Sequence, residues 1–393
     1  MKIAMVFDGL GIGGIERVGI DYIKLLEDAG HTVTVYNLNP AADELEKEIG
    51  ENVIIDKISF ARKVCPEMYV VLIKRYWWGK YVYLPVHIVL NVVLTGYKLL
   101  KKKRKEKYDF AIAFSGHFND LTFVAKEFVN SENKIAWIHG GILDYALLSS
   151  GFLMLYKKIH NIVSLSSFYE NGVLNVNRYL RDINIKKIYN PTFIGKRKLN
   201  VEIVNELKSK YGEFFLMVGR FTKEKDHCTV IKAMELLKAE YRIERKILFV
   251  GDGPERERVE KIVCEKGLKE QIIFMGNRYD VQNYYAASSI LIHSSPAEGL
   301  PTVILEAMHF GIPVVATNSL PGVPEILEGT QDGLVCPVGD AEKMAEYLYD
   351  LITQPELYKK YSQRGKKRIK DFEPENIQKE LLEFLYRIKD NKS

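Results

Sequence analysis

Two glutamates near the C-terminal third of the sequence occupy positions where a carboxylate could bind a polar ligand. Glu298 and Glu306 enclose seven residues, which begin with Gly299–Pro301 and continue as the start of an apolar helix. We expect Glu298 to lie in a loop and Glu306 in the second turn of a helix that begins near Thr302. The free N–H groups at that helix start could receive a phosphate. Because the neighbours of Glu306 are apolar, its carboxylate needs a partner inside the fold.

A basic pair follows an apolar segment upstream of these glutamates. The segment Phe214–Val218 predicts a β-strand, and Gly219, Arg220 and Lys225 come soon after it. An arginine offers phosphate oxygens a planar fork of donors, and a lysine adds a mobile point charge. A solvated basic loop is the alternative interpretation. Together with the two glutamates, the pair indicates half of a nucleotide-sugar site, with cations for a diphosphate and carboxylates for hydroxyl groups.

A glycine-rich segment, Gly9–Gly14, follows the first expected strand and fits the dinucleotide pattern Gly-x-Gly-x-x-Gly. An NAD site would need an acidic residue about 20 positions further on, but the second expected strand ends in Tyr36–Asn39 without a carboxylate. We therefore discount NAD, although the glycines still allow N–H groups to approach an anion. A turn that merely needs positive φ is the alternative. His139 follows another expected strand and precedes Gly140 and Gly141, but a lone histidine is more often structural.

Short apolar runs alternate with longer amphipathic ones along the chain, which is typical of parallel sheets with helices on both faces. The expected fold class is α/β, with two Rossmann-like, doubly wound parallel-sheet domains that face each other across a cleft. The first domain should cover residues 1–191, the second 192–371, and a C-terminal helix within 372–393 should cross back to the first; we interpret 192–200 as a linker. Ligands of open α/β sheets bind beyond the carboxyl ends of the strands, where every motif above falls. The expected strands are Lys2–Phe7, Thr32–Leu38, Asp109–Phe114, Lys134–Ile138, Ile162–Leu165, Ile185–Tyr189, Phe214–Val218, Lys246–Val250, Ile272–Met275, Ile290–His293 and Pro313–Ala316.

The composition limits the class of protein. With 393 residues, 47% of them hydrophobic, the chain can form packed domains, and its formal net charge of +5 is too weak to indicate nucleic-acid binding. The four cysteines form no Cys-x-x-Cys motif, which argues against a zinc site or a disulfide framework and favours a reducing cytosol. The apolar run at the N-terminus is too short for a signal peptide.

Four segments together resemble retaining glycosyltransferases of family 4 (glycosyl transferases group 1), which have the GT-B fold. These segments are Glu298–Glu306, Gly219–Lys225, Val250–Pro254 and Gly13–Arg17, and the resemblance covers essentially the whole chain in the right order. It implies transfer of a hexose or N-acetylhexosamine from a UDP-sugar to a saccharide acceptor, which we expect to be lipid-linked. Such a reaction would serve the synthesis of cell-surface polysaccharide or glycolipid.

The resemblance also implies roles for individual residues. Arg220 and Lys225 would bind the donor diphosphate, Glu298 would hold the sugar hydroxyls, and His139 would approach the transferred sugar. Glu306 would accept the ribose hydroxyls. Glu16 and Arg17 would face the acceptor, and Gly276 and Asn277 would lie near the base of the donor. The full set of further donor contacts is Gly13, Gly14, Gly219, Gly276, Asn277, Gly299, Leu300, Pro301 and Thr302.

The chemistry fits these residue types. Breaking a bond between a sugar and a diphosphate builds negative charge on the leaving oxygens, and fixed cations and helix N–H groups oppose that charge. The sequence has no Asp-x-Asp motif in a suitable loop and no clear carboxylate nucleophile, so we expect neither a metal ion nor another cofactor. We expect same-face attack in which a donor phosphate oxygen takes the acceptor proton, a step that the resemblance implies.

One stretch complicates the picture of a soluble protein. Residues 81–97 contain no Asp, Glu, Lys or Arg, and residues 98–107 are strongly basic. A spanning helix needs about 20 apolar residues, and a proline, a histidine and an asparagine interrupt this run. We expect a helix that lies partly against anionic lipid headgroups, with Trp77 and Trp78 near the interface, in a cytoplasmic protein peripheral to the inner face of the membrane. A buried helix with a solvated basic tail is the alternative.

Two other functions stay open on the sequence. A nucleotide-sugar epimerase on the same fold would share the phosphate and ribose contacts but would form product from the donor alone. A non-catalytic protein that binds sugar nucleotides or polysaccharide would bind UDP without turnover. The complete set of Arg220, Lys225, Glu298 and Glu306 argues against a decayed site.

Overall fold

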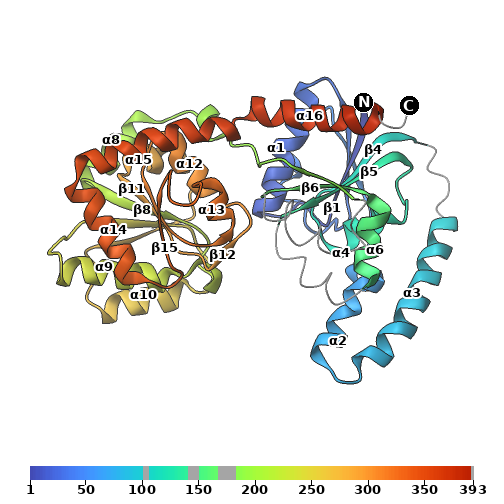
Figure 1. Ribbon diagram of the computed structural model, residues 1–393, viewed down its shortest axis with the longest axis horizontal. Helices are drawn as coiled ribbons and strands as arrows, with labels where there is room; N and C mark the ends of the chain where they lie inside the picture. Colours follow the sequence, from blue (N-terminus) through green and yellow to red (C-terminus); the bar gives the residue numbers. More distant parts are fainter. Residues whose placement is uncertain (101–105, 140–149, 167–182, 391–393) are drawn as a thin grey trace. The chain divides into compact units, whose positions relative to one another are not determined.

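The computed structural model describes residues 1–100, 106–139, 150–166 and 183–390. The chain divides into two compact units, Met1–Pro191 with Ile377–Ser393, and Thr192–Asn376. Each unit has its own parallel sheet with helices packed around it (Figure 1). The sequence prediction of two parallel-sheet α/β domains is therefore confirmed.

The described residues of the first unit form a seven-stranded parallel sheet in the order β3-β2-β1-β4-β5-β6-β7. Along the chain, strands are added on one side of β1 up to β3 and on its other side from β4 onward. The carboxyl ends of β1 and β4 therefore lie side by side, as at the binding crevice of other doubly wound sheets. The strands are β1 Lys2–Phe7, β2 Thr32–Asn37, β3 Ile54–Lys57, β4 Tyr108–Ala113, β5 Ser131–Ile138, β6 Asn161–Ser164 and β7 Asn184–Lys187.

The helices of the first unit include one from the far end of the chain. They are α1 Gly14–Asp28, α2 Val71–Arg75, α3 Gly79–Leu100, α4 Phe118–Ala125, α6 Ser150–Ile159 and α16 Pro374–Asp390, with the 3-10 turns η1 Glu46–Glu48, η2 Arg62–Val64 and η3 Pro66–Val70. The C-terminal helix α16 is fixed to this unit by a hydrogen bond from Gln378 Nε2 to Leu25 O (2.7 Å) and by an ion pair of Lys389 with Asp109 (2.8 Å).

The second unit has a six-stranded parallel sheet in the order β10-β9-β8-β11-β13-β15. Its strands are β8 Phe214–Val218, β9 Lys246–Val250, β10 Ile272–Gly276, β11 Ile290–His293, β13 Val314–Thr317 and β15 Leu334–Cys336, and a separate pair joins β12 Ala297–Glu298 to β14 Leu320–Pro321. Its helices are α8 Val201–Tyr211, α9 His227–Ala239, α10 Arg256–Glu265, α11 Val281–Ala287, α12 Thr302–Phe310, α13 Gly322–Ile326, α14 Ala341–Thr353 and α15 Pro355–Arg368, with the 3-10 turns η6 Ile194–Lys196, η7 Lys223–Lys225 and η8 Ile369–Phe372.

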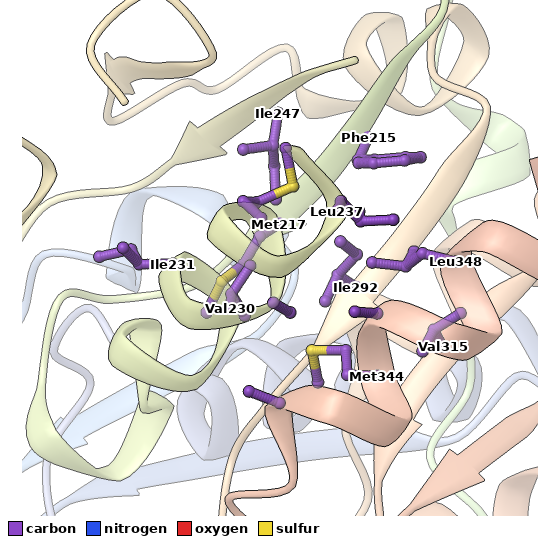
Figure 2. Packing of buried hydrophobic residues seen from close by; sticks show 14 of the residues in the cluster. Phe215, Met217, Val230, Ile231, Leu237, Ile247, Ile292, Val315, Met344 and Leu348 are labelled. Carbon is purple, nitrogen blue, oxygen red and sulfur yellow. The ribbon is translucent and has the colours of Figure 1, made fainter. Parts of the chain in front are cut away.

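A buried apolar core holds the strands of the second unit in place. Figure 2 shows side chains of the central strands, among them Phe215, Met217, Ile292 and Val315, packing against α9 and α14. All four are at most 4% exposed. This packing fixes the ends of β8 and β11, from which the loops that carry Lys225 and Ser294 begin.

Several sequence expectations need correction. Glu298 was expected in a loop but belongs to β12, because it pairs with Pro321 of β14. The stretch 192–200, interpreted as a linker, contains η6 and packs within the second unit: a Cβ on Gly195 would lie 2.3 Å from Cε1 of His309. Strand β3 was missed because half of its residues are charged and none is fully buried, and β15 because it is only three residues long.

Candidate functional site

Lys225 and Glu298 meet at the carboxyl end of the second sheet. The Lys225 ammonium forms an ion pair with Glu298 Oε1, and both side chains are partly buried. Lys225 lies in η7, at the end of the loop after β8, whereas Glu298 lies in β12. The fold thus brings together two predicted site residues that are 73 positions apart in the sequence.

The charge of Glu298 is strongly stabilised. Burial by itself raises the pKa of this carboxyl, but His293, Lys225 and Ser295 outweigh burial and lower the pKa to about 2. His293 is buried at the end of β11, and burial lowers its pKa although Glu298 acts in the opposite direction. At neutral pH the site therefore contains a carboxylate between an ammonium and a neutral imidazole. Sequence reasoning missed His293, although a histidine that ends an apolar strand was a usable signal.

The loop that carries Lys225 is held by its backbone. Lys225 N donates to Thr222 O (3.1 Å), and Ser294 Oγ donates to Lys225 O (2.8 Å). Ser294 follows β11 directly, so the hydrogen bond ties the loop after β8 to the next strand of the sheet. The ammonium of Lys225 is consequently presented by a fixed main chain.

Three glycines lie where the loops after β8, β9 and β10 approach each other closely, and two of them have positive φ. Gly219 N donates to Val250 O (3.0 Å), and Gly251 N donates to Gly276 O (2.9 Å). Gly251 has a φ of +142°, and a Cβ there would lie 2.0 Å from Gly219 O. Gly276 has a φ of +68°. A Cβ on Gly219 itself would only touch Lys225 side-chain carbons at 3.8 Å, so the fold does not require glycine there.

Glu306 lies in the second turn of α12, where the sequence placed it, and it is half-buried. Burial raises its pKa, while the Tyr285 hydroxyl and the Arg197 guanidinium act to lower it. Tyr285 is buried on α11 and stacks on Phe310 at a centroid distance of 6.1 Å. Arg197 and Tyr285 were not predicted as site residues: Arg197 was interpreted as part of a linker, and Tyr285 belongs to none of the motifs that the sequence analysis singled out.

The turn between Glu298 and α12 contains the other predicted donor contacts. Leu300 and Pro301 are buried, and Gly299 and Thr302 are partly exposed. No side chain caps α12, so its first N–H groups carry no side-chain acceptor. A Cβ on Gly322 would lie 2.5 Å from Gly299 O, which shows how tightly α13 packs against this turn.

Arg220 and Asn277 lie at the same edge of the second sheet. Arg220 is exposed directly after Gly219, and Asn277 is exposed directly after β10. Strand β9 lies between β8 and β10 in the sheet, so Arg220 and Asn277 follow two strands that are separated by one strand.

The first unit places four predicted residues around the start of α1. Gly13 is the N-cap residue in an extended conformation, and the space beside Gly14 is open. The Glu16 carboxylate folds back over Gly13, where an added Cβ would lie 2.1 Å from Glu16 Oε2. Arg17 instead forms an ion pair with Glu48 on η1. Glu16 and Arg17 therefore diverge and do not form a joint surface.

His139 is held as a neutral imidazole. Its Nε2 lies 2.7 Å from Phe114 O and therefore carries the proton that it donates to this carbonyl. Burial lowers its pKa to about 4, helped by the nearby His117 and opposed by the carbonyl. Only Nδ1 can then accept a hydrogen bond. Gly140 and Gly141, which follow His139 in the sequence, lie outside the described residues.

A polar cluster around Asp8 was not predicted. Asp8 follows β1, and its carboxylate accepts hydrogen bonds from Arg62 Nε (2.7 Å) and Asn119 and lies 3.0 Å from His117 Nδ1. Burial acts to raise the pKa of Asp8, but His117, Arg62 and Asn119 outweigh it and lower the pKa. The hydrogen bond to Asp8 raises the pKa of His117.

The carboxyl group of Asp120 lies beneath this cluster, at the start of α4. Its two oxygens accept the backbone N–H groups of Gly116 (2.8 Å) and His117 (2.7 Å). Burial nevertheless raises the pKa of Asp120 to about 7. Arg62 and His117 keep part of their surface exposed, so the cluster presents two anchored donors at the carboxyl ends of β1 and β4. The aspartate directly after β1 was the one sequence signal for this cluster.

Within residues 1–100, 106–139, 150–166 and 183–390, no group of three or more His, Cys, Asp or Glu side chains is arranged to hold a metal ion.

Comparison with known sequences identifies the second unit. The family model described as "Glycosyl transferases group 1" matches residues 201–368. An uncharacterized glycosyltransferase of Haemophilus influenzae is 33% identical over 195 residues, which cover 49% of this chain and 53% of that protein. The N-acetyl-alpha-D-glucosaminyl L-malate synthase of Bacillus anthracis is 28% identical over 200 residues, covering 49% of this chain and 51% of that protein. The chain thus spans about half the length of the curated relatives it matches.

Comparison with solved structures covers nearly the whole chain. The Anabaena protein Alr3699/HepE, solved in complex with UDP and glucose, superposes with a TM-score of 0.70 at 20% identity, covering 98% of this chain and all of that one. Sucrose-phosphate synthase of Thermosynechococcus elongatus also gives a TM-score of 0.70 at 20% identity, covering both chains completely. At this identity the likeness establishes the fold. Residues 201–368 match the glycosyl transferases group 1 family, and the whole chain has the GT-B fold.

Proposed function

We propose that this protein is a retaining glycosyltransferase that moves a hexosyl or N-acetylhexosaminyl group from a UDP-sugar to a saccharide acceptor. The observation that carries the proposal is the ion pair of Lys225 with Glu298 at the carboxyl end of the second sheet. This pair lies inside the segment that matches the family, next to the uncapped start of α12. An ammonium and free helix N–H groups suit a diphosphate, and a carboxylate suits sugar hydroxyls.

The donor would bind along the edge formed by the loops after β8, β10 and β12. In this arrangement Arg220 and Lys225 contact the diphosphate, and Glu306 accepts the ribose hydroxyls. The uracil lies near Gly276 and Asn277, and Glu298 with the backbone of residues 299–302 holds the transferred sugar. The relative Alr3699/HepE was solved with UDP, with UDP and glucose, and with UDP-glucose, which supports UDP as the nucleotide.

The reaction would be a same-face displacement. The bond from the anomeric carbon to the diphosphate oxygen breaks while the acceptor hydroxyl oxygen bonds to the same carbon. The hydroxyl proton passes to a donor phosphate oxygen, and UDP leaves. Lys225 and Arg220 stabilise the charge that develops on the leaving oxygens, without reorganisation at the moment of reaction. His139 is neutral and commits its Nε2 proton to Phe114 O, so it would contact the sugar only as an acceptor through Nδ1.

The acceptor is proposed to be a lipid-linked saccharide used for cell-surface polysaccharide or glycolipid. A relative from Campylobacter jejuni, 26% identical over 210 residues (52% of this chain, 58% of that protein), is named as an N-acetyl-D-galactosaminyltransferase acting on a PP-undecaprenol-linked saccharide. In the first unit, Arg62 and His117 are polar groups that could position such an acceptor, together with Glu16. Arg17 is the weaker candidate because it pairs with Glu48.

The test is a transfer assay over a panel of nucleotide sugars and lipid-linked acceptors. Wild-type protein should transfer sugar from at least one UDP-sugar, and product should require the acceptor. Lys225→Ala should lower the rate on the order of 10²–10³-fold. Lys223→Ala, in the same turn but fully on the surface, is the matched control and should retain the rate. Unchanged transfer in Lys225→Ala and Glu298→Gln would sink the assignment. Product from donor alone would instead indicate an epimerase.

A further inference from the structure

Helix α3 is the most unusual surface element of the first unit. It runs from Gly79 to Leu100 and is long and apolar enough to cross a membrane by length and composition alone. Only 6% of its most apolar 18-residue window is buried. A helix that covers a soluble core buries its apolar face and exposes its polar one. In α3 this relation is reversed.

Three polar side chains of α3 face the protein: those of His87, Asn91 and Lys98. Asn91 accepts a hydrogen bond from the ammonium of Lys126, and Lys98 pairs with Glu127 Oε2 at 3.1 Å. His87 Nε2 lies 3.7 Å from Oε1 of the buried Glu67. Positions 87, 91 and 98 share one face of a helix, together with Leu94, which is buried in the core of the unit. These contacts fix the rotation of the helix about its own axis.

The opposite face of α3 is apolar and exposed. Its members are large hydrophobic side chains that are each at least 51% exposed: Tyr81, Leu84, Ile88, Val89, Val92, Val93 and Leu99. We call these seven residues the outer face. Thr95 is exposed nearby, but its hydroxyl donates to Asn91 O of the preceding turn (2.8 Å) and needs no water. An exposed apolar patch of this size on a soluble protein marks an interaction surface.

We propose that the outer face of α3 inserts into one leaflet of a lipid bilayer with anionic headgroups and anchors the first unit to it. This inference goes beyond the proposed transfer reaction and does not depend on it. The helix lies along the bilayer surface, because the contacts of His87, Asn91 and Lys98 with the folded unit hold its other face. A crossing helix of about 33 Å would have to give up all three contacts.

The residues that flank the outer face argue for a lipid surface. At its N-terminal end Trp77 and Trp78 are exposed, and Trp78 stacks on Tyr76 with the ring centroids 4.7 Å apart. Tryptophan and tyrosine favour the headgroup level of a bilayer. Arg75 and Lys80 are exposed at the same end, and five consecutive basic residues, 101–105, follow the helix in the sequence and lie outside the described residues.

The charges near the outer face also argue against a second copy of the chain as its binding partner. Two outer faces in contact would bring the cations at the ends of one helix close to those of the other. No acidic residue lies between Gly79 and Lys105 to compensate. Anionic lipid headgroups complement this distribution, and each basic residue near such a surface adds about 1 kcal/mol of attraction in general.

The test is flotation of the full chain with vesicles of phosphatidylcholine alone or mixed with phosphatidylglycerol. Wild-type protein should float with the mixed vesicles, and added salt should weaken this binding. Ile88→Glu/Val92→Glu places two charges on the outer face and should lower the floated fraction about tenfold or more. Val201→Glu/Val338→Glu adds the same charges at exposed valines of the second unit and should float as the wild type does.

Tryptophan fluorescence tests whether the N-terminal end of α3 enters the bilayer, and its result does not depend on whether the outer-face variant folds. The chain has three tryptophans, of which Trp137 is buried and Trp77 and Trp78 are exposed. Vesicles should shift the emission to shorter wavelength in the wild type, and Trp77→Phe/Trp78→Phe should abolish the shift while most of the flotation remains. The proposal fails if flotation is equal for the outer-face variant and the wild type. It also fails if the wild type does not float but dimerises in solution and the outer-face substitutions abolish the dimer.

Discussion

His293 at the end of β11 lies 3.4 Å, Nε2 to Oε1, from Glu298 in β12. The imidazole is buried, so it approaches the carboxylate from inside the fold, and the partly exposed Lys225 ammonium binds the same oxygen. A buried group that fixes a partly exposed carboxylate is a typical way to orient a ligand-binding side chain. This relationship makes His293 a positioning residue in the proposed donor site.

Replacing His293 by Ala should therefore change how activity depends on pH. The pKa of Glu298 is lowered to about 2, in part by His293, so the loss of the imidazole should raise it. Because a donor sugar needs the ionised carboxylate, the acidic limb of kcat/KM should move to higher pH. His227→Ala, which removes another buried imidazole that stacks on Phe221, controls for loss of packing and should not move this limb. An unchanged limb in His293→Ala would refute the positioning role.

Glu306→Gln should separate stability from donor binding. Burial raises the pKa of Glu306, so the neutral amide should not lower the thermal midpoint and could raise it. If Glu306 accepts the ribose hydroxyls, loss of charge-assisted hydrogen bonds should weaken UDP binding roughly 10–100-fold. Isothermal titration with UDP, beside a melting curve, gives both quantities. UDP binding as tight as in the wild type would remove Glu306 from the donor site.

Gly251 and Gly219 provide a matched pair of backbone tests. Ala at position 251 would place its Cβ 2.0 Å from Gly219 O at a φ of +142°, so Gly251→Ala should destabilise the second unit by several kcal/mol. Ala at position 219 meets only side-chain carbons at ordinary contact distance, so Gly219→Ala should melt like the wild type. If the donor approaches the Gly219 backbone, Gly219→Ala should raise the donor KM. A Gly219→Ala enzyme with wild-type kinetics would contradict the predicted contact.

Asp120 should make the stability of the first unit fall as pH rises. In the folded protein its pKa is raised to about 7, compared with 3.8 for the unperturbed group. Between these values the folded state binds the proton and the unfolded state has released it. The contribution is therefore fully present below about pH 4 and is lost by about pH 7, with a slope of at most about 1.4 kcal/mol per pH unit.

Chemical unfolding at a series of pH values checks this behaviour. Asp120→Asn should lack this loss of unfolding free energy, while it keeps one oxygen to accept a backbone N–H. Asp28→Asn on the exposed surface controls for the substitution itself. Parallel pH profiles of wild type and Asp120→Asn would show that Asp120 is ionised throughout.

Much of the fold was predictable because its strands are short, buried and continuous in apolar residues. The bounds of β1, β8, β9 and β11 agree with the sequence prediction, and most other strands differ by one to three residues at an end. The pairing of β12 with β14 was not predictable in this way, since two-residue strands carry no periodic signal and form through a contact between Glu298 and Pro321 in the folded chain.

The candidate site was predictable only where residue type and strand position coincide. Lys225, Glu298 and Glu306 follow strand ends or a helix start, and the sequence pattern selected them. Arg197 and Tyr285 approach Glu306 only through tertiary packing of η6 and α11 against α12, so no local pattern identified them. For α3 the composition indicated an apolar helix, but the reversal of its faces needed the contacts of His87, Asn91 and Lys98.

The most direct test of the donor site is a crystal structure of the protein with UDP. The account predicts the diphosphate against Lys225 Nζ and the first N–H groups of α12, the ribose hydroxyls on Glu306, and the uracil beside Gly276 and Asn277. A complex in which UDP occupies another part of the molecule, with the Lys225–Glu298 pair untouched, would contradict it.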